Sequence, residues 1–410
     1  MKKTVFVMGA GSTAYLGLPM TKVQEELLQE LNGDLLGNLK TILDGTFGKG
    51  KYSVNDVYNV IDSNLLLHNA LRFENVRIET YELEKCKKDL ISFLFKHFLE
   101  NIKSTVDDEK HRKLISFYRR LAEIELKKKQ NCSEYFEKRE EFISSYSIIN
   151  FNWDLYSLLP ILEANSEVNH VNDHYLSIGR NPQLRVFTDF NCEYAAKENE
   201  EEYWYPFTEP AAFIANSRKY DSTRRVLLTK CFLPHGAMNL FKCTACAKHS
   251  YYLGNLTVKS VASKINYSNN EEAFLYKCPY CKEKIYSRDY DVLVQSNFKV
   301  RNSFLEEIRL SMMEQLRKAD RLIFIGYSMP NDDVDYITMF KSLYKNLREV
   351  FVVLSEQGAE NRFVTYKNLA TEQARKDAEN YEKVFGDSVK YNMAGFPDAI
   401  DEILKIVEQP

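Results

Sequence analysis

Four cysteines form two closely spaced pairs in the sequence. Cys243 and Cys246 are separated by two residues, as are Cys278 and Cys281, and 31 residues lie between the pairs. Four thiolates arranged in this way are typical of tetrahedral structural zinc, although the intervening segment is longer than usual. The alternative is two reduced pairs without metal. Because four cysteines complete a closed site, we expect one structural Zn²⁺ with no open position for catalysis.

One histidine, His235, lies in the segment "PHG" that precedes Cys243. The metal does not need this residue, and histidine suits general-base chemistry near neutral pH. A buried structural histidine is the alternative, and the His-Gly pair alone does not distinguish the two. His170 and His174 have a spacing that could bind metal from one helix face, but their polar, Asn-rich segment favours a solvated loop.

A glycine-containing turn follows the first apolar run. Gly9, Ala10, Gly11 and Ser12 come directly after it, and glycines at such a turn let backbone N–H groups approach a phosphate. Ala14 stands where the dinucleotide-binding fingerprint has its third glycine. A plain tight turn therefore explains this segment about as well as a nucleotide site.

Polar side chains end the second apolar run, in "INFNWD" (149–154). Asn150, Asn152 and Asp154 would lie at the carboxyl end of a parallel strand, where α/β folds bind ligands. Asp154 can also cap the helix that follows. We expect Asn150, Asn152 and Asp154 to face the ligand crevice.

A later run ends in "IGYSMPNDDVD" (325–335), with Gly326 and Ser328 in the turn. The acidic run favours a helix cap over a metal site, with Asn331 to Asp333 at the helix N-terminus, because carboxylates stabilise that end of a helix.

Five apolar runs predict the strands that position these residues. Runs of this length bounded by Gly, Asn or Pro are typical of the interior of a parallel sheet with helices on both faces. They cover residues 4–8, 146–151, 226–233, 321–325 and 349–354. The predicted fold class is α/β, a doubly wound Rossmann-like parallel sheet.

Two insertions are expected in this core. Helical periodicity between the first two strands predicts a helical insertion, with one apolar face formed by Leu83, Cys86, Leu90, Leu94 and Phe98 and another by Leu114, Phe117, Leu121 and Ile124. The expected boundaries are 1–20, 146–235 and 291–410 for the Rossmann domain, 21–145 for the helical insertion and 236–290 for the zinc-binding module.

Composition excludes several classes of protein. The 410 residues include 55 basic and 58 acidic ones, so the net charge of −3 does not indicate nucleic-acid binding. No run of eighteen or so uninterrupted apolar residues predicts a membrane span. Glycines interrupt the apolar N-terminus, which argues against a signal peptide and favours a cytoplasmic protein.

Taken in order, these motifs resemble the sirtuin superfamily, whose members cleave NAD. The likeness extends over nearly the whole chain and lies in "GAGST" and "GLP" (9–19), "NFNWD" (150–154), "PHG" (234–236), the two cysteine pairs, "ADRLIFIGYS" (319–328) and "VFVVLSE" (350–356).

The chain departs from the sirtuin protein deacylases in several places. Their Gly-Ile-Pro loop continues to an Asp-Phe-Arg triplet, whereas Met20 follows Pro19 here. The Gln of their Thr-Gln-Asn-x-Asp motif is Phe151, their "GTS" turn is "GYS" (326–328), and "VLVQSNFKV" (292–300) replaces their peptide-gripping strand. The departures look more like the sirtuin-like NAD-consuming effectors of bacterial antiphage defence.

This resemblance implies a function and a set of site residues. It implies NAD⁺ hydrolysis to nicotinamide and ADP-ribose, with Asn152 and His235 as catalytic residues. It also implies control by a partner, such as a DNA-translocating ATPase of a defence system. The NAD-binding residues would be Gly9, Ala10, Gly11, Ser12, Asn152, Asp154, Gly326 and Ser328. Because the helical faces exceed what one crossover needs, we also expect a homo-oligomer.

Two functions from other classes stay open at this point. The chain could be an NAD-dependent protein deacylase, or it could recognise NAD or ADP-ribose without turnover, as a sensor or a scaffold subunit with latent activity. Intact Asn152 and His235 favour an enzyme.

Overall fold

The computed structural model describes residues 2–17, 26–105, 108–129, 138–175, 183–195, 208–217, 224–254, 258–265, 274–286, 290–292, 301–343 and 347–409. The expected "LP" of the first loop, most of the segment 292–300 and Cys132 lie outside these ranges.

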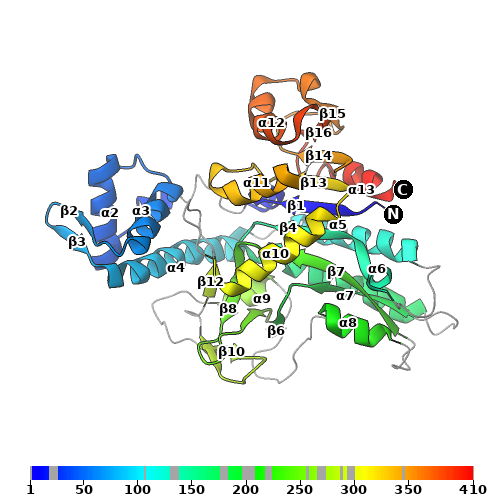
Figure 1. Cartoon of the computed structure of the whole chain (residues 1–410), viewed down its shortest axis with the longest axis horizontal. Coiled ribbons are helices and arrows are strands. Elements are labelled where there is room, and N and C mark those ends of the chain that lie inside the picture. The colour runs from blue at the N-terminus through cyan, green and yellow to red at the C-terminus, as the bar shows by residue number, and fades with distance from the viewer. Residues whose placement is uncertain are drawn as a thin grey trace.

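An eight-stranded sheet forms the centre of the fold (Figure 1). In spatial order its strands are β15 (Val364–Thr365), β16 (Val389–Asn392), β14 (Glu349–Val353), β13 (Arg321–Ile325), β1 (Thr4–Met8), β4 (Ile143–Asn150), β7 (Arg224–Phe232) and β5 (Gln183–Asp189). All neighbours pair in parallel except β15, which is antiparallel to β16. Every residue of β1 and β13 is buried, which explains why the residues after Thr4 and Arg321 in these strands are all apolar.

Helices cover both faces of this sheet, so the predicted doubly wound α/β class is confirmed. Phe6 of β1 packs edge-on against Phe117, and Phe324 of β13 packs against Phe340 and Tyr381 on the opposite face. One face carries α5 (Asp108–Lys129), α7 (Leu159–Tyr175) and α13 (Ile400–Glu408), and the other carries α6 (Arg139–Phe142), α8 (Glu209–Asn216), α10 (Ser303–Arg317), α11 (Val334–Leu343) and α12 (Glu372–Phe385).

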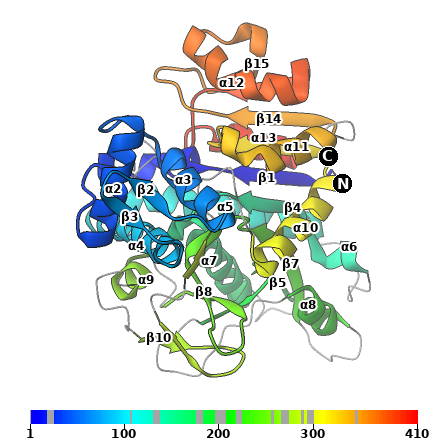
Figure 2. The ribbon, with the colours of Figure 1, turned by 60° about the vertical axis from the view of Figure 1, so that its left-hand side comes forward.

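The chain between β1 and α5 builds a unit at one end of the molecule (Figure 1, left), and Figure 2 shows it coming forward. It contains α2 (Asp34–Phe47), α3 (Val54–Leu66), the hairpin β2 (Leu71–Phe73) and β3 (Val76–Ile78), and α4 (Thr80–Thr105). All five residues of the first predicted helical face are buried on α4, and all four of the second are buried on α5. Among the described helices, none is both long and apolar enough to cross a membrane.

The cysteine pairs lie in a second unit, built from short strands that lie below the central sheet in Figure 1. A four-stranded sheet contains β12 (Tyr290–Val292), β8 (Gly236–Lys242), β9 (His249–Tyr252) and β6 (Glu193–Ala195), and a hairpin contains β10 (Phe274–Lys277) and β11 (Lys284–Tyr286). Helix α9 (Val258–Lys264) lies between β9 and β10 in the chain and packs against α4.

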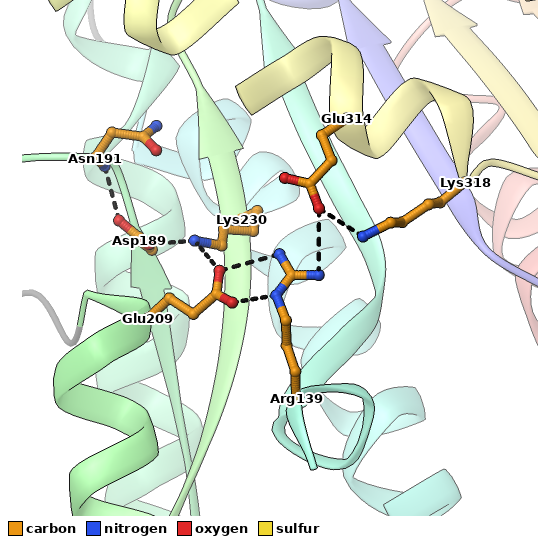
Figure 3. A network of polar contacts seen from close by, with 7 residues as sticks. All are labelled: Arg139, Asp189, Asn191, Glu209, Lys230, Glu314 and Lys318. Atoms are coloured by element: carbon orange, nitrogen blue, oxygen red, sulfur yellow. Dashed lines mark hydrogen bonds and ion pairs between the residues drawn. The ribbon is translucent and has the colours of Figure 1, made fainter. Parts of the chain in front are cut away.

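A network of charges joins the sheet to the helices on the face of α8 (Figure 3). Lys230 of β7 lies 2.6 Å from the Asp189 carboxylate and 2.9 Å from that of Glu209, and Glu209 also pairs with Arg139. Burial works to raise the pKa of Glu209, but hydrogen bonds from Arg139 and Lys230 outweigh it and lower the pKa to about 2. Every charge drawn in this network has an opposite partner, so its role is to fasten α6 and α8 to the sheet.

Candidate active site

The loops that leave β1, β4 and β13 meet at the carboxyl edge of the sheet. These strands are neighbours and run parallel, with Met8 paired to both Asn150 and Ile325 at their ends. The fold therefore brings the predicted residues of the first loop next to Asn152 and Gly326. His235 follows β7, the next strand beyond β4.

Glycine is required where the loops of β1 and β13 touch. Gly326 has φ +60°, and a Cβ there would lie 2.2 Å from the backbone of Gly11. A Cβ on Gly11 would lie 2.7 Å from Cα of Gly326, and one on Gly9 would lie 2.7 Å from Cα of Tyr327. The two loops are thus packed backbone against backbone, and this contact alone accounts for the Gly9-x-Gly11 pattern.

Backbone N–H groups of the first loop already have acceptors within the protein. Gly9 donates to the carbonyl of Ile325, Gly11 to that of Gly326, and Ser12 to that of Gly9. A phosphate at this turn would have to displace these bonds or be held by other groups. The exposed parts of the turn are Ala10 and, across from it, Ser328.

Asn152 is held in one orientation by its amide group. Its Nδ2 donates to the carbonyl of Gly9 at 3.1 Å and to Oγ of Ser12 at 3.2 Å, and both of these residues are buried. A carbonyl oxygen can only accept a hydrogen bond, so the amide group that faces Gly9 must be the NH₂ group of Asn152 and not its oxygen. Within the described chain no hydrogen bond engages Oδ1, and Oδ1 is not among the buried atoms that lack a partner. Oδ1 is therefore an oriented acceptor that a ligand hydroxyl or a water can reach.

Asp154 caps the 3-10 helix η3 (Leu155–Ser157), as the sequence suggested. Its carboxylate accepts the N–H of Tyr156 at 2.8 Å and the hydroxyl of Thr13 at 3.3 Å. Burial raises its pKa from 3.8 to about 6, and these two hydrogen bonds offset part of that effect. The side chain thus ties the β4 loop to the β1 loop at a cost in desolvation.

His235 is enclosed by aromatic rings and faces a carboxylate. Its ring packs edge-on against Phe151, with the centroids 5.0 Å apart, and against Tyr336 at 5.5 Å. Phe151 directly precedes Asn152, so this contact places His235 beside the β4 loop. Nε2 is buried and lies 3.2 Å from Oδ1 of Asp333. This is ion-pair distance, and Nε2 has no hydrogen-bond partner within the described chain.

Asp333 is a residue of the site that was not predicted from the sequence. The acidic residues do lie at a helix start, as expected, because Asp332 and Asp333 are in the first turn of η5 (Asn331–Asp333), which leads into α11. The carboxylate of Asp333 is buried and faces the ring of His235. Its Oδ2 accepts the hydroxyl of Tyr327 at 2.6 Å. Its position was the available signal, since these residues follow the carboxyl end of β13, at the same edge of the sheet where Asn152 follows β4.

The four cysteines converge, and the chain fits a zinc ion there. Their Sγ atoms all lie within 4.8 Å of one another, with Cys243 3.6 Å from Cys281 and Cys246 3.7 Å from Cys278. Four sulfurs about 2.3 Å from a central zinc lie roughly 3.8 Å apart in a tetrahedron. The cluster is thus compatible with zinc, and within the described chain it includes neither His235 nor any other histidine or carboxylate.

Comparison with known proteins gives a limited result. No protein-family model matches the sequence, and no curated protein matches it. Among solved structures, a Sir2 homologue in complex with NAD is 11% identical over 99% of this chain and 90% of that one, with a TM-score of 0.38. A structure of a Sir2 enzyme, solved to explain the mechanism and regulation of these enzymes, is 11% identical over 100% of this chain and 94% of that one. Its TM-score is also 0.38. Sir2 bound to an acetylated peptide is 11% identical over 99% of this chain and 91% of that one, with a TM-score of 0.32. The resemblance to Sir2 structures is thus distant, and at these TM-scores it defines neither function nor mechanism.

Proposed function

We propose that this chain hydrolyses the nicotinamide–ribose bond of NAD⁺ and releases nicotinamide and ADP-ribose. The observation that carries this proposal is the pair of oriented side chains at the carboxyl edge of the sheet. Asn152 offers Oδ1 as an acceptor, and His235 lies beside the same loop through its contact with Phe151. Small residues, Ala10 and Ser328, are exposed on the neighbouring loops, where a dinucleotide could lie.

Asn152 suits the part of the reaction at the ribose. Cleavage of an N-glycosidic bond passes through an oxocarbenium-like state with positive charge at C1′. A neutral amide oxygen can hold a ribose hydroxyl or the attacking water without adding a competing charge. Because Gly9 and Ser12 fix the amide before substrate arrives, little reorganisation is needed during the reaction.

His235 suits the proton transfer. The water oxygen bonds to C1′, its proton passes to the imidazole, and the glycosidic electron pair leaves with nicotinamide, which departs neutral. The imidazole then releases the proton to solvent, so the products are ADP-ribose, nicotinamide and H⁺. The buried Asp333 carboxylate beside the ring would stabilise the charged imidazolium.

The zinc ion supplies no step of this reaction. Cys243, Cys246, Cys278 and Cys281 would hold it in a closed, four-coordinate site whose contribution is to folding.

Water is the proposed acceptor because the sequence lacks the deacylase features noted above. The resemblance to antiphage effectors further supports depletion of cellular NAD under the control of a partner protein, and assembly as a homo-oligomer. Exposed apolar side chains on the unit formed by α2 to α4 are consistent with such an interface. They are Leu66, Leu67 and Tyr81, each more than half exposed.

Product analysis tests the proposal. Purified protein is incubated with NAD⁺ alone and with NAD⁺ plus an acetylated peptide, over a wide range of protein concentration, and the products are identified by mass spectrometry. We expect nicotinamide and ADP-ribose in equal amounts without peptide. Asn152→Ala and His235→Ala should each lower nicotinamide release by about 10²-fold or more, with unchanged zinc content and circular dichroism.

Two results would contradict the proposal. Faster peptide deacetylation than NAD⁺ hydrolysis would favour the deacylase. Measurable NAD⁺ binding without nicotinamide at any protein concentration would favour the sensor.

A further inference from the structure

A buried Tyr–Asp–His arrangement lies behind the proposed catalytic histidine. It links Tyr327 and Asp333, which follow β13, to His235, which follows β7. The hydroxyl of Tyr327 donates to Oδ2 of Asp333 at 2.6 Å, and Oδ1 of the same carboxylate lies 3.2 Å from Nε2 of His235. Asp333 is 2% exposed and His235 is 7% exposed, so this arrangement is shielded from solvent.

We infer that Asp333 is a positioning residue that keeps the proton of neutral His235 on Nε2 and leaves Nδ1 as the atom that accepts the proton from water. This inference rests on the proposed function for its catalytic meaning.

The assignment of the two ring nitrogens follows from their surroundings. A carboxylate can only accept a hydrogen bond, so the nitrogen that faces Asp333 must carry hydrogen. That nitrogen is Nε2, which is buried, has no hydrogen-bond partner within the described chain and has the Asp333 carboxylate 3.2 Å away. Within the described chain no hydrogen bond engages Nδ1, and Nδ1 is not among the buried atoms without a partner. The lone pair of Nδ1 is therefore free for a proton.

Tyr327 keeps the carboxylate in place. Burial, followed by the charge of Asp333, raises the pKa of Tyr327 well above its ordinary value, so its hydroxyl remains a donor at any working pH. Its ring stacks on Phe151 with the centroids 4.7 Å apart, and its hydroxyl occupies Oδ2. The remaining oxygen, Oδ1, is then directed at His235.

The backbone before Asp333 has an unusual conformation that supports this role. Met329 is buried with φ +51°, a left-handed conformation that costs a non-glycine residue about 1 kcal/mol. Its carbonyl accepts a hydrogen bond from Asn380 on α12. This turn carries the chain from the exposed Ser328 to the buried Asp333 within five residues.

Isosteric variants test the inference. Asp333→Asn keeps the size of the side chain but removes its charge, and Tyr327→Phe removes only the hydroxyl. Asp335→Asn is the matched control, because Asp335 loses the same charge nearby but is exposed and pairs with Arg301. Thermal midpoint and zinc content are measured first for each variant.

The first readout does not depend on activity. Nitrogen-15 chemical shifts of the histidine side chains distinguish the two neutral tautomers. Wild-type His235, assigned by its absence in His235→Ala, should show Nε2–H in the NAD-free protein. Asp333→Asn should convert it to a mixture of tautomers, and Asp335→Asn should leave it unchanged. The inference is overturned if wild-type His235 carries its proton on Nδ1, or if the tautomer of His235 is the same in Asp333→Asn as in the wild type.

The second readout is the kinetics of NAD⁺ hydrolysis. Asp333→Asn should lower kcat by about 10²-fold, at the lower end of what general acid–base catalysis contributes, with little change in KM. Tyr327→Phe should cause a smaller loss of kcat. An active wild type with an unaffected Asp333→Asn variant overturns the inference and leaves the proposed function intact. An inactive wild type with the expected tautomer change refutes the function and leaves the Asp333–His235 arrangement standing.

Discussion

Replacing Asp154 with asparagine should stabilise the protein, and the gain should depend on pH. Burial raises the pKa of this carboxyl from 3.8 to about 6 in the folded protein, with partial offset from its bonds to Tyr156 and Thr13. The folded state therefore holds the proton more tightly than the unfolded chain does. The stability that this group contributes is complete below pH 3.8 and is lost as the pH rises through about 6.

The size of the effect follows from the shift. A pKa difference of roughly two units at about 1.4 kcal/mol each makes the ionised Asp154 cost about 3 kcal/mol at pH 8 and about half as much at pH 5. Asparagine keeps an acceptor for the N–H of Tyr156 but carries no charge. With an unfolding entropy of roughly 2.1 cal/mol/K per residue, the melting temperature should rise by about 3–4 °C at pH 8 and by about 2 °C at pH 5.

Thermal unfolding of the two proteins at both pH values measures this effect. Asp335→Asn serves as the control, because its exposed pair with Arg301 is worth at most about 1 kcal/mol. No gain for Asp154→Asn at pH 8 would refute the reasoning that burial dominates this carboxyl. An equal gain at both pH values would show that the stabilisation does not come from the charge.

Three further predictions concern metal, substrate and the charge network. Cys243→Ser should lose the single zinc and destabilise the fold, as measured by metal analysis and thermal unfolding; a well-folded, zinc-loaded variant would disprove a structural site. Gly11→Val should lose about 1–3 kcal/mol of stability together with NAD⁺ binding, because the added side chain collides with the adjacent loop at Gly326. Ser328→Tyr, at an exposed position, should weaken NAD⁺ binding, measured by calorimetry, without a change in melting temperature. Lys230→Met should cost about 3 kcal/mol in chemical denaturation because it leaves the buried Asp189 carboxylate without its cation, while Lys318→Met, half exposed, should cost less than about 1 kcal/mol.

The sequence predicted the central strands well because burial on both faces leaves a simple signal. "TVFVM" of β1 and "RLIFI" of β13 are buried throughout, so no polar residue interrupts them. The edge strand β5 was missed, since its sequence "QLRVFTD" alternates polar and apolar residues and follows a polar stretch. The hairpin of β2 and β3 was missed because Glu74 adopts a left-handed turn that carries no glycine signal.

Side-chain direction was harder to predict than strand position. The cysteine cluster and the cap formed by Asp154 needed only local spacing and were confirmed. The contact between His235 and Asp333 joins residues 98 positions apart, and no local pattern reveals it. The polar segment around His170 was interpreted as a loop, but it belongs to α7, which extends to Tyr175.

The cysteine unit is connected to the candidate active site through the backbone around Gly236. Gly236 has φ +72°, and a Cβ there would lie 2.6 Å from the carbonyl oxygen of Asp291. The side chain of Asp291 in turn lies 2.9 Å from His249 and accepts a hydrogen bond from Asn302, which caps α10. The turn that carries His235 is therefore held at Gly236, where β8 pairs with β12. The other end of β8 is followed directly by Cys243. A zinc ion that holds β8 in place would therefore hold the direction of His235 as well, through the backbone alone.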